Sequence, residues 1–337
     1  MARARVAVRL LLCGALLLPV AGCGETGGSA GGPVSATAAA GFPYTVSNCG
    51  VKTAFPGPPE RAVTMNQHAT ELLLALGLQD RMAGTAYLDD AVLPEYRKAY
   101  DGVKVLAQEY PSKEVLLGAA PDFVYGGYGT AFDQGAGRDR AGLEKAGIRT
   151  RLNVEYCTDG PVGLDQLRAE IGEVARTFGV RERGERLIRE QERRIGAVKE
   201  RVAGRDRPSV FVYDSGDTSA FTVGGAGIGH EIVSLAGGAN VFGDVRKPFG
   251  DVSWEQVIAR RPEVIVIVDY GGTSVEAKKR RLLEDPALAG VPAVRDRRFA
   301  VLPLSSAVLG VRVAGAVEAL AGQLHGEGGR DGGAGAR

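Results

Sequence analysis

Short apolar runs alternate with amphipathic segments along most of the chain. The apolar runs are typical of buried strands and lie at residues 61–65, 122–126, 209–213, 263–268 and 299–304. Helical spacing of apolar side chains occurs at residues 69–77, 113–120, 140–147 and 254–261. A helix between two strands returns the chain to the same end of a sheet, so this alternation favours parallel pairing. The pattern predicts an α/β fold with mainly parallel sheets.

Two stretches of the chain repeat one motif. Residues 112–124 and 253–265 both read Ser-x-Glu, then two apolar residues, then Pro followed by an acid and a strand-like run, at identical spacing. In a second pair, Glu71 and Glu231 each stand at the head of an apolar helical segment that ends in glycine. Because the two motifs keep the same order in both halves, the repeat predicts two related lobes. Chance similarity between short α/β units is the alternative.

The segment between the two halves, residues 163–205, has a helical pattern with one densely charged face. Its apolar stripe consists of Leu164, Leu167, Ile171, Val174, Phe178, Leu187, Ile195, Val198 and Val202. The stripe does not keep a clean heptad, which argues against a coiled coil. We therefore predict one long helix packed across both lobes, with an N-terminal lobe at 43–160, the connecting helix at 161–205 and a C-terminal lobe at 206–325.

The N-terminus has the features of an export signal. Arg3, Arg5 and Arg9 precede an apolar run that is too short to span a bilayer and that ends in Val-Ala-Gly before Cys23. This ending resembles the lipobox of bacterial lipoproteins, in which the cysteine is lipidated; ordinary cleavage beside an incidental cysteine is the alternative. We expect a signal peptide at 1–22, a flexible tether at 23–42 and a disordered tail at 326–337.

Net charge and cysteine content narrow the possible functions. The formal net charge is +1, from 41 basic and 40 acidic residues, so nothing favours nucleic acid as a partner. Of four cysteines, Cys13 lies in the signal and Cys23 is the expected lipid site. The remaining two, Cys49 and Cys157, are predicted to form a disulfide in the exported protein. A zinc site from these two cysteines has no matching His or Cys spacing.

The whole arrangement resembles one family of transport proteins. The chain resembles the solute-binding proteins of ABC importers for iron-siderophores and cobalamin. The resemblance lies in the order of its segments, which is a lipobox, a tether, a lobe, a long helix and a second lobe, and in the paired Ser-x-Glu motifs. The resemblance implies a monomer with ligand in a cleft between its lobes, and an ABC permease dimer with its ATPase as partner. It also implies that Glu114 and Glu255, at equivalent helix starts, reach basic pockets on the two permease subunits.

Three stretches carry a finer resemblance. Residues 46–71, 86–96 and 105–114 look like the actinobacterial subgroup proposed to bind a precursor of the deazaflavin coenzyme F-420. The ligand that the resemblance implies is an organic cofactor or chelate, either a ferric siderophore, a corrinoid or a deazaflavin-type molecule.

A ligand site is expected at the turn formed by Asn66, Gln67 and His68. The turn leads from a predicted strand into a predicted helix, and α/β folds bind ligands at the carboxyl ends of parallel strands. A helix cap with Thr70 as the capping hydroxyl is the local alternative. Other loops at such strand ends carry Tyr87, Glu109, Tyr110, Tyr125, Tyr128, Phe221, Phe249, Trp254 and Tyr270. So many aromatic side chains suit a large, planar, partly apolar ligand, although core packing explains any one of them as readily.

Arginines in similar loops are candidates to bind anionic groups of the ligand. They are Arg138, Arg140 and Arg312. A phosphate, carboxylate or catecholate would use them, whereas a neutral corrinoid would need them less. A solvated position on the surface is the alternative for each.

Metal binding and catalysis have weaker support in the sequence. A zinc or manganese site needs several converging His and carboxylate ligands, but the chain has three histidines, His68, His230 and His325. Alignment of the repeats sets His230 against Thr70, which favours a helix-start role for that histidine. A tethered α/β hydrolase would need a nucleophile with a matched base, and its candidate, Ser215, more readily ends a strand. We predict a binding protein without catalytic residues, resident metal or cofactor.

Overall fold

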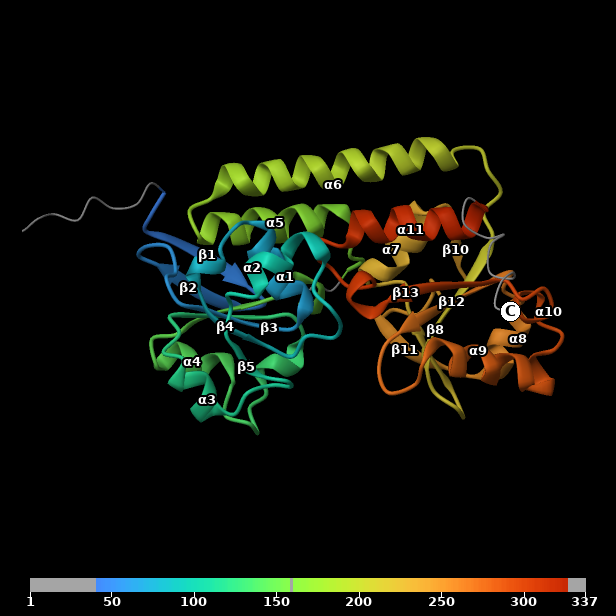
Figure 1. Ribbon diagram of the computed structural model, residues 1–337, viewed down its shortest axis with the longest axis horizontal. Coiled ribbons are helices and arrows are strands. Elements are labelled where there is room, and N and C mark those ends of the chain that lie inside the picture. The colour runs from blue at the N-terminus through green and yellow to red at the C-terminus, as the bar shows by residue number, and fades with distance from the viewer. Residues whose placement is uncertain (1–40, 158–159, 327–337) are drawn as a thin grey trace, which may run out of the picture. The chain divides into compact units, whose positions relative to one another are not determined.

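The strands that the sequence predicts lie in two separate sheets (Figure 1). The structure, a computed structural model, describes residues 41–157 and 160–326. The five apolar runs form β3 (Ala62–Met65), β6 (Phe123–Gly126), β8 (Ser209–Ser215), β12 (Val264–Asp269) and β13 (Phe299–Pro303). The prediction of an α/β fold with mainly parallel sheets is therefore confirmed.

The first lobe is built on five parallel strands in the order β5, β4, β3, β6, β7. Its further strands are β4 (Met82–Ala86), β5 (Val105–Ala107) and β7 (Arg149–Leu152), with a separate antiparallel hairpin of β1 (Tyr44–Asn48) and β2 (Val51–Phe55). Its helices are α1 (Gln67–Ala75), α2 (Arg97–Tyr100), α3 (Lys113–Gly118) and α4 (Arg140–Lys145), with 3₁₀ helices η1 (Gln79–Arg81), η2 (Pro94–Tyr96), η3 (Gly129–Phe132) and η4 (Val154–Tyr156). The central strand β3 is buried along its whole length.

The second lobe is built on a six-stranded sheet that is only partly parallel. Its strand order is β11, β9, β8, β12, β13, with β10 (Ala239–Asn240) also on β8. Strands β10, β8, β12 and β13 are parallel, whereas β9 (Ala220–Val223) pairs antiparallel with both β8 and β11 (Phe249–Val252). The helices are α7 (Ile228–Leu235), α8 (Trp254–Arg260), α9 (Val275–Glu284), α10 (Pro292–Arg295) and α11 (Val313–His325), with η5 (Pro286–Leu288) and η6 (Leu304–Ser306).

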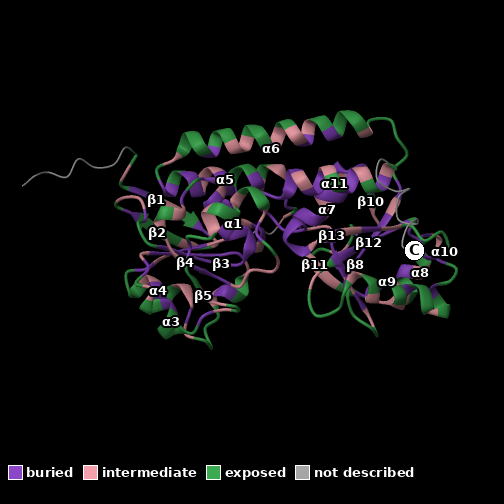
Figure 2. Cartoon of the chain, in the orientation of Figure 1, coloured by how far each residue is buried: buried purple, intermediate pink, exposed green. Residues whose placement is uncertain are grey.

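The segment predicted as one connecting helix contains two helices. A turn at residues 178–180 joins α5 (Leu164–Thr177) to α6 (Arg181–Val202). Gly179 has a φ of 70° in this turn, a left-handed conformation that ends an α-helix. Helix α6 packs against both α5 and α11, so it lies along both lobes (Figure 1). Much of its surface is exposed, while the strands of both sheets are largely buried (Figure 2).

Both copies of the Ser-x-Glu motif have the same local structure. Each is a short helix followed by a buried strand, α3 with β6 and α8 with β12. Ala120 and Arg261, at the same place in the two copies, both have a φ of 47°. The acid after proline ties its strand to the start of a neighbouring strand, because Asp122 accepts backbone N–H bonds from residues 60 and 61 and Glu263 accepts one from Ser209. The repeat in the sequence thus corresponds to a repeat in the fold.

A disulfide joins Cys49 to Cys157, as predicted. The two Cα atoms are 4.9 Å apart, and the bond links the turn between β1 and β2 to the end of η4. Asn48 reinforces this contact, since its side chain exchanges two hydrogen bonds of 2.9 Å with the backbone of Leu152. The N-terminal hairpin is thereby held against the first sheet.

Several predicted segments lie outside the described residues. They are the signal peptide at 1–22, Cys23, nearly all of the tether at 23–42 and all but the first residue of the tail at 326–337. Within the part of the chain that the structure describes, no helix combines the length and the apolar character needed to cross a membrane.

Candidate functional site

A cleft of about 490 Å³ opens where strands of both sheets end. Tyr87 follows β4, Tyr128 follows β6 and Tyr270 follows β12, so each lobe contributes side chains from its carboxyl edge. The full lining is Tyr87, Asp89, Glu109, Tyr110, Tyr128, Thr130, Tyr156, Asp214, Phe221, Phe249, Tyr270 and Leu304. This edge is where α/β folds bind ligands, and seven of the predicted site residues meet there.

Paired aromatic rings form much of the cleft wall. Tyr87 packs edge-on against Tyr110, with ring centroids 4.6 Å apart. The Tyr110 hydroxyl is held by a 2.9 Å hydrogen bond with Thr130. In the other lobe, Phe221 and Phe249 stack at 5.9 Å with an angle of 11° between their planes. Rings fixed in this way leave flat apolar faces for a planar ligand.

The turn at Asn66, Gln67 and His68 lies beneath the cleft and does not line it. All three side chains are buried. The Asn66 side chain donates to the hydroxyl of Tyr110 at 3.0 Å and accepts from the backbone N–H of Tyr128 at 3.2 Å. In this structure the turn therefore positions two tyrosines of the cleft.

His68 supports the cleft by packing. Its imidazole lies edge-on to Tyr128, with ring centroids 4.9 Å apart, and leaves no room for a side chain at Gly127. Its Cβ atom approaches Gly310 as closely. Burial lowers the pKa of His68 to about 4, so the ring is neutral near pH 7. Thr70 is not the cap of this helix. It lies inside α1, which begins at Gln67, and its hydroxyl donates to the carbonyl of residue 66 at 3.0 Å, whereas a capping hydroxyl accepts a backbone N–H.

Arg312 binds protein carboxylates beneath the cleft. Its guanidinium lies 2.6 Å from Glu71 and 3.1 Å from Asp90, and it donates to the carbonyl of Ala91 at 2.8 Å. The Arg312 and Glu71 side chains are 8% and 0% exposed. Arg312 precedes α11 in the second lobe and Glu71 belongs to α1 in the first, so this buried ion pair joins the lobes.

Four further residues that the sequence suggested are bound to other protein groups. Arg138 donates to two backbone carbonyls, and its guanidinium lies 5.2 Å from the centroid of the Tyr110 ring. Arg140 donates to backbone and hydroxyl groups beside β7. Trp254 donates its indole N–H to a backbone carbonyl and packs against core aromatic rings. Tyr125 is buried within β6 and donates to a buried glutamate. None of the four lines the cleft.

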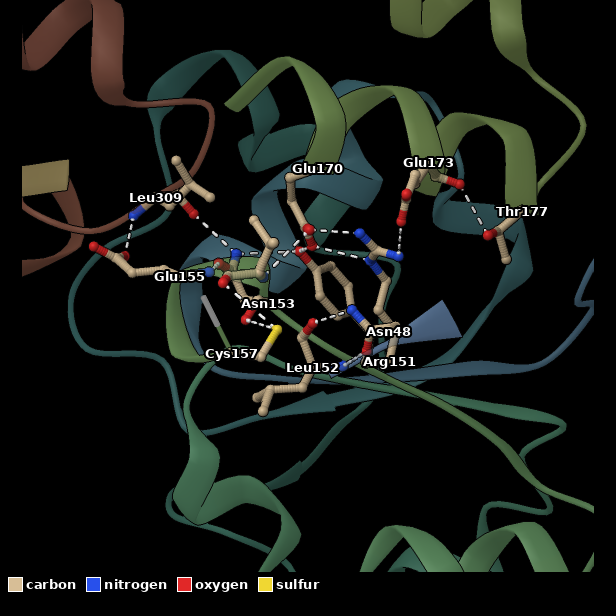
Figure 3. A network of polar contacts seen from close by, with 12 residues as sticks. Asn48, Arg151, Leu152, Asn153, Glu155, Cys157, Glu170, Glu173, Thr177 and Leu309 are labelled. Atoms are coloured by element: carbon tan, nitrogen blue, oxygen red, sulfur yellow. Dashed lines mark hydrogen bonds and ion pairs between the residues drawn. The ribbon is translucent and has the colours of Figure 1, made fainter. Parts of the chain in front are cut away.

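A second polar connection between the lobes involves Asn153 and Glu155 (Figure 3). Asn153 donates to the carbonyl of Leu309 at 3.0 Å, while Glu155 accepts from the backbone N–H groups of Leu309 at 2.7 Å and Ile228 at 2.8 Å. Burial raises the pKa of Glu155 to about 7, although both N–H donors favour its charged form. These side chains follow β7 at its carboxyl end and hold both lobes at the base of the cleft.

Two acids of the cleft have perturbed protonation. Burial and the neighbouring charge of Asp90 raise the pKa of Asp89 to about 6. Burial also raises the pKa of Asp214, against the effect of the Lys278 ammonium 3.9 Å away. In its ionised form a carboxylate only accepts hydrogen bonds, so each of these acids then suits a ligand group that donates one.

Five lining residues were missed by reasoning from the sequence. They are Asp89, Thr130, Tyr156, Asp214 and Leu304. All five lie at or within four residues of the carboxyl end of a strand, and Thr130 and Tyr156 belong to the short helices η3 and η4 that follow β6 and β7. Their position just after a strand is the signal in the sequence that marks them. Their residue types do not, since apart from Tyr156 they are neither aromatic nor basic.

Glu114 and Glu255 are exposed in the first turns of α3 and α8. The hydroxyls of Ser112 and Ser253 cap these helices, each accepting a backbone N–H at 3.3 Å. The pKa of Glu114 is lowered by its backbone N–H, and that of Glu255 by the Ser253 hydroxyl. Each lobe thus presents one exposed carboxylate at an equivalent position.

The histidines are dispersed in the fold. His68 lies under the cleft, His230 packs near Gly243, and the His325 ring hydrogen-bonds the carbonyl of residue 236. Across residues 41–157 and 160–326, no three His, Cys, Asp or Glu side chains are grouped as a metal site would require. Ser215 is the last residue of β8, which is the strand-end position that the sequence favours.

Two α/β lobes with a ligand-sized cleft between them define a two-lobed solute-binding protein. Comparison with known families agrees with this class. The periplasmic binding protein family matches residues 63–305, and the chain belongs to this family. Since its relatives are binding proteins, the chain is a binding protein and not an enzyme.

Known proteins resemble this chain over both lobes. The vitamin B12-binding protein of Yersinia pestis is 26% identical over 212 residues, 62% of this chain and 69% of the relative. A periplasmic binding protein structure from Veillonella parvula is 31% identical with a TM-score of 0.78, covering 84% of this chain and 97% of that one. An ABC-type Fe3+-hydroxamate transport system structure from Saccharomonospora viridis is 26% identical with a TM-score of 0.72, covering 84% and 99%.

Proposed function

We propose that this chain is the substrate-binding component of an ABC importer and captures an organic cofactor or chelate in its cleft. The observation that carries the proposal is the cleft itself, in which aromatic side chains of both lobes surround about 490 Å³. This volume and lining suit an organic molecule. Vitamin B12 and a ferric hydroxamate occur in the names of similar proteins. A ferric siderophore, a corrinoid or a deazaflavin-type molecule would fit the class.

Delivery to a permease is supported by the two exposed glutamates. Glu114 and Glu255 stand one on each lobe, which matches a permease with two related subunits. In this proposal the protein docks as a monomer on the permease dimer, and the ATPase drives import.

Attachment to the outer face of the cell membrane is proposed from the motif before Cys23. The tether would leave the lobes free to reach the permease. Replacing Cys23 by alanine should release the protein from membranes into the soluble extracytoplasmic fraction, and membrane retention of that variant would contradict the anchor.

Mass spectrometry of what copurifies with the protein from its native source tests the proposed function. One organic molecule per chain is expected. Tyr128→Ala should lose this ligand because it removes a ring from the cleft, whereas Tyr100→Ala, a matched change in α2 outside the cleft, should retain it. Stoichiometric zinc or manganese with no organic species would overturn the proposal.

A further inference from the structure

The charges that line the cleft are all negative. Asp89, Glu109 and Asp214 are part of its lining, which includes no lysine, arginine or histidine among the described residues. The sequence predicts the opposite, since three arginines lie in loops of this kind. The negative charge of the lining therefore bears on which ligands the cleft can accept.

Cations near the cleft are held by other protein groups. Arg138, whose guanidinium lies 5.2 Å from the centroid of the Tyr110 ring, donates to two backbone carbonyls. The Lys278 ammonium lies 3.9 Å from Asp214 and donates to the carbonyls of Val268 at 2.7 Å and Tyr270 at 3.1 Å. The Lys278 side chain is only 2% exposed. Arg312 is held by two carboxylates of its own. Neither Lys278 nor Arg312 can turn toward an anionic ligand without leaving buried acceptors unpaired.

Asp89 keeps unused hydrogen-bonding capacity in the cleft. One of its carboxylate oxygens and the hydroxyl of Tyr128 are buried, and the interaction of this hydroxyl with the Asp89 carboxylate favours the charged form of Asp89. One hydroxyl satisfies only part of the acceptor capacity of a carboxylate, so a ligand that donates a hydrogen bond can supply a further partner. Because an ionised carboxylate only accepts hydrogen bonds, the ligand group opposite Asp89 is a hydroxyl, an amide N–H or an amine.

We propose that the cleft selects ligands without negative charge, namely planar ring systems that stack on its aromatic side chains and direct hydrogen-bond donors at Asp89 and Asp214. This inference rests on the proposed function, because it assigns a ligand class to the same cleft. A phosphate or carboxylate on the ligand would meet carboxylates and no available cation. Uncharged polyhydroxylated ring systems are accepted, and their phosphorylated forms are rejected.

Riboflavin and flavin mononucleotide are a matched pair of probes, because they share one planar ring system and differ by a single phosphate. Fluorescence titration of the mature protein near neutral pH should give a Kd for riboflavin at least about ten-fold lower than for flavin mononucleotide, equivalent to about 1.4 kcal/mol. In about 1 M salt the ratio should fall, since the Debye length shortens to about 3 Å.

Charge-neutral variants assign the selection to the cleft. Asp89→Asn combined with Asp214→Asn keeps the side-chain shapes and should reduce the ratio to about three-fold or less. Glu200→Gln removes the same charge from an exposed position near the end of α6, outside the cleft lining, and should leave the ratio unchanged. Melting temperatures of all variants check that the fold is intact.

Equal binding of the two flavins would overturn charge selection, and so would an unchanged ratio in the double variant. Binding of neither flavin at millimolar concentration would overturn the proposed ring class. These results leave the import function standing wherever an organic ligand copurifies with the protein. Copurification of a metal ion alone would remove the proposed function itself.

Discussion

At the scale of single residues, the carboxyl group of Glu155 is buried between backbone N–H groups of the second lobe. Its pKa is raised to about 7 from an ordinary value of 4.5, chiefly by burial. Between these two values the folded protein holds a proton that the unfolded chain has released. The contribution of Glu155 to stability is therefore fully present below pH 4.5 and is lost as the pH rises through 7.

Glu155→Gln should remove this pH dependence. In wild type the group lowers the free energy of unfolding by up to about 1.4 kcal/mol per pH unit between the two pKa values. Urea unfolding of both proteins at several pH values between 4.5 and 7 measures the difference in slope. His68, whose pKa is lowered to about 4, reduces the free energy of unfolding as the pH falls. This contribution is the same in both proteins, so it cancels in the difference between their slopes. Parallel pH profiles would contradict the assignment.

Arg312→Ala should destabilise the protein strongly. The change leaves the buried Glu71 carboxylate without its partner, which typically costs about 3–5 kcal/mol. Arg194→Ala is a matched control, because its partner Glu318 is 37% exposed and such pairs contribute about 0–1 kcal/mol. Chemical denaturation of both variants gives the two values, and similar losses would argue against a buried link between the lobes.

At the scale of elements, the first turns of α3 and α8 present Glu114 and Glu255. Charge reversal of both to arginine should reduce uptake by roughly ten-fold or more, because it adds repulsion at basic pockets that the free protein never meets. Ligand affinity should stay unchanged. Each reversal should cost only a little stability, through the loss of an acid that favours the helix dipole.

Glu276→Arg is the control for this experiment. Glu276 also lies in the first turn of a helix, α9, behind a capping serine, and it pairs with Lys279 at 3.0 Å. Its reversal therefore has at least the same local cost, without a docking role. Uptake is measured in cells that carry the cognate permease. Normal uptake by the double variant, or an equal loss with Glu276→Arg, would remove the docking proposal.

At the scale of the whole molecule, the disulfide closes a loop of 108 residues within the first lobe. The Cys49→Ser, Cys157→Ser double variant should lose about 2–5 kcal/mol, mainly because its unfolded state is less restricted. Urea unfolding with and without a reductant checks this. The reductant should lower the free energy of unfolding of the wild type and leave that of the variant unchanged. An equal free energy of unfolding of the wild type with and without reductant would contradict the disulfide.

The sequence predicted the architecture well because its main signals are local. Apolar runs and helical spacing located β3, β6, β8, β12 and β13 close to their observed bounds. The Ser-x-Glu repeat identified Glu114 and Glu255 as equivalent helix starts. The turn that splits the connecting segment into α5 and α6 was missed, since Gly179 lies in a stripe of apolar positions that continues on both sides.

The candidate site could be located from the sequence only in part. The sequence predicted, from their position after strands, that Tyr87, Tyr110, Tyr128 and Tyr270 would lie in one cleft. All four line it. The same reasoning suggested Arg138 and Arg312, which turn out to bind carbonyls and carboxylates inside the protein. Which direction a loop side chain takes depends on what else is buried nearby, and a buried charge must find its partner first.

Residue type, spacing and periodicity were enough to predict the α/β class, five of the strands and the paired motifs, and the export signal with the cysteine count predicted the disulfide. The tertiary structure alone decided the character of the cleft. It buried Asn66, Gln67 and His68 in a supporting layer, paired Arg312 with the distant Glu71, and left Asp89 and Asp214 in the lining of the cleft. These outcomes depend on contacts such as that of Glu71 with Arg312, which only the packing of the two lobes brings together.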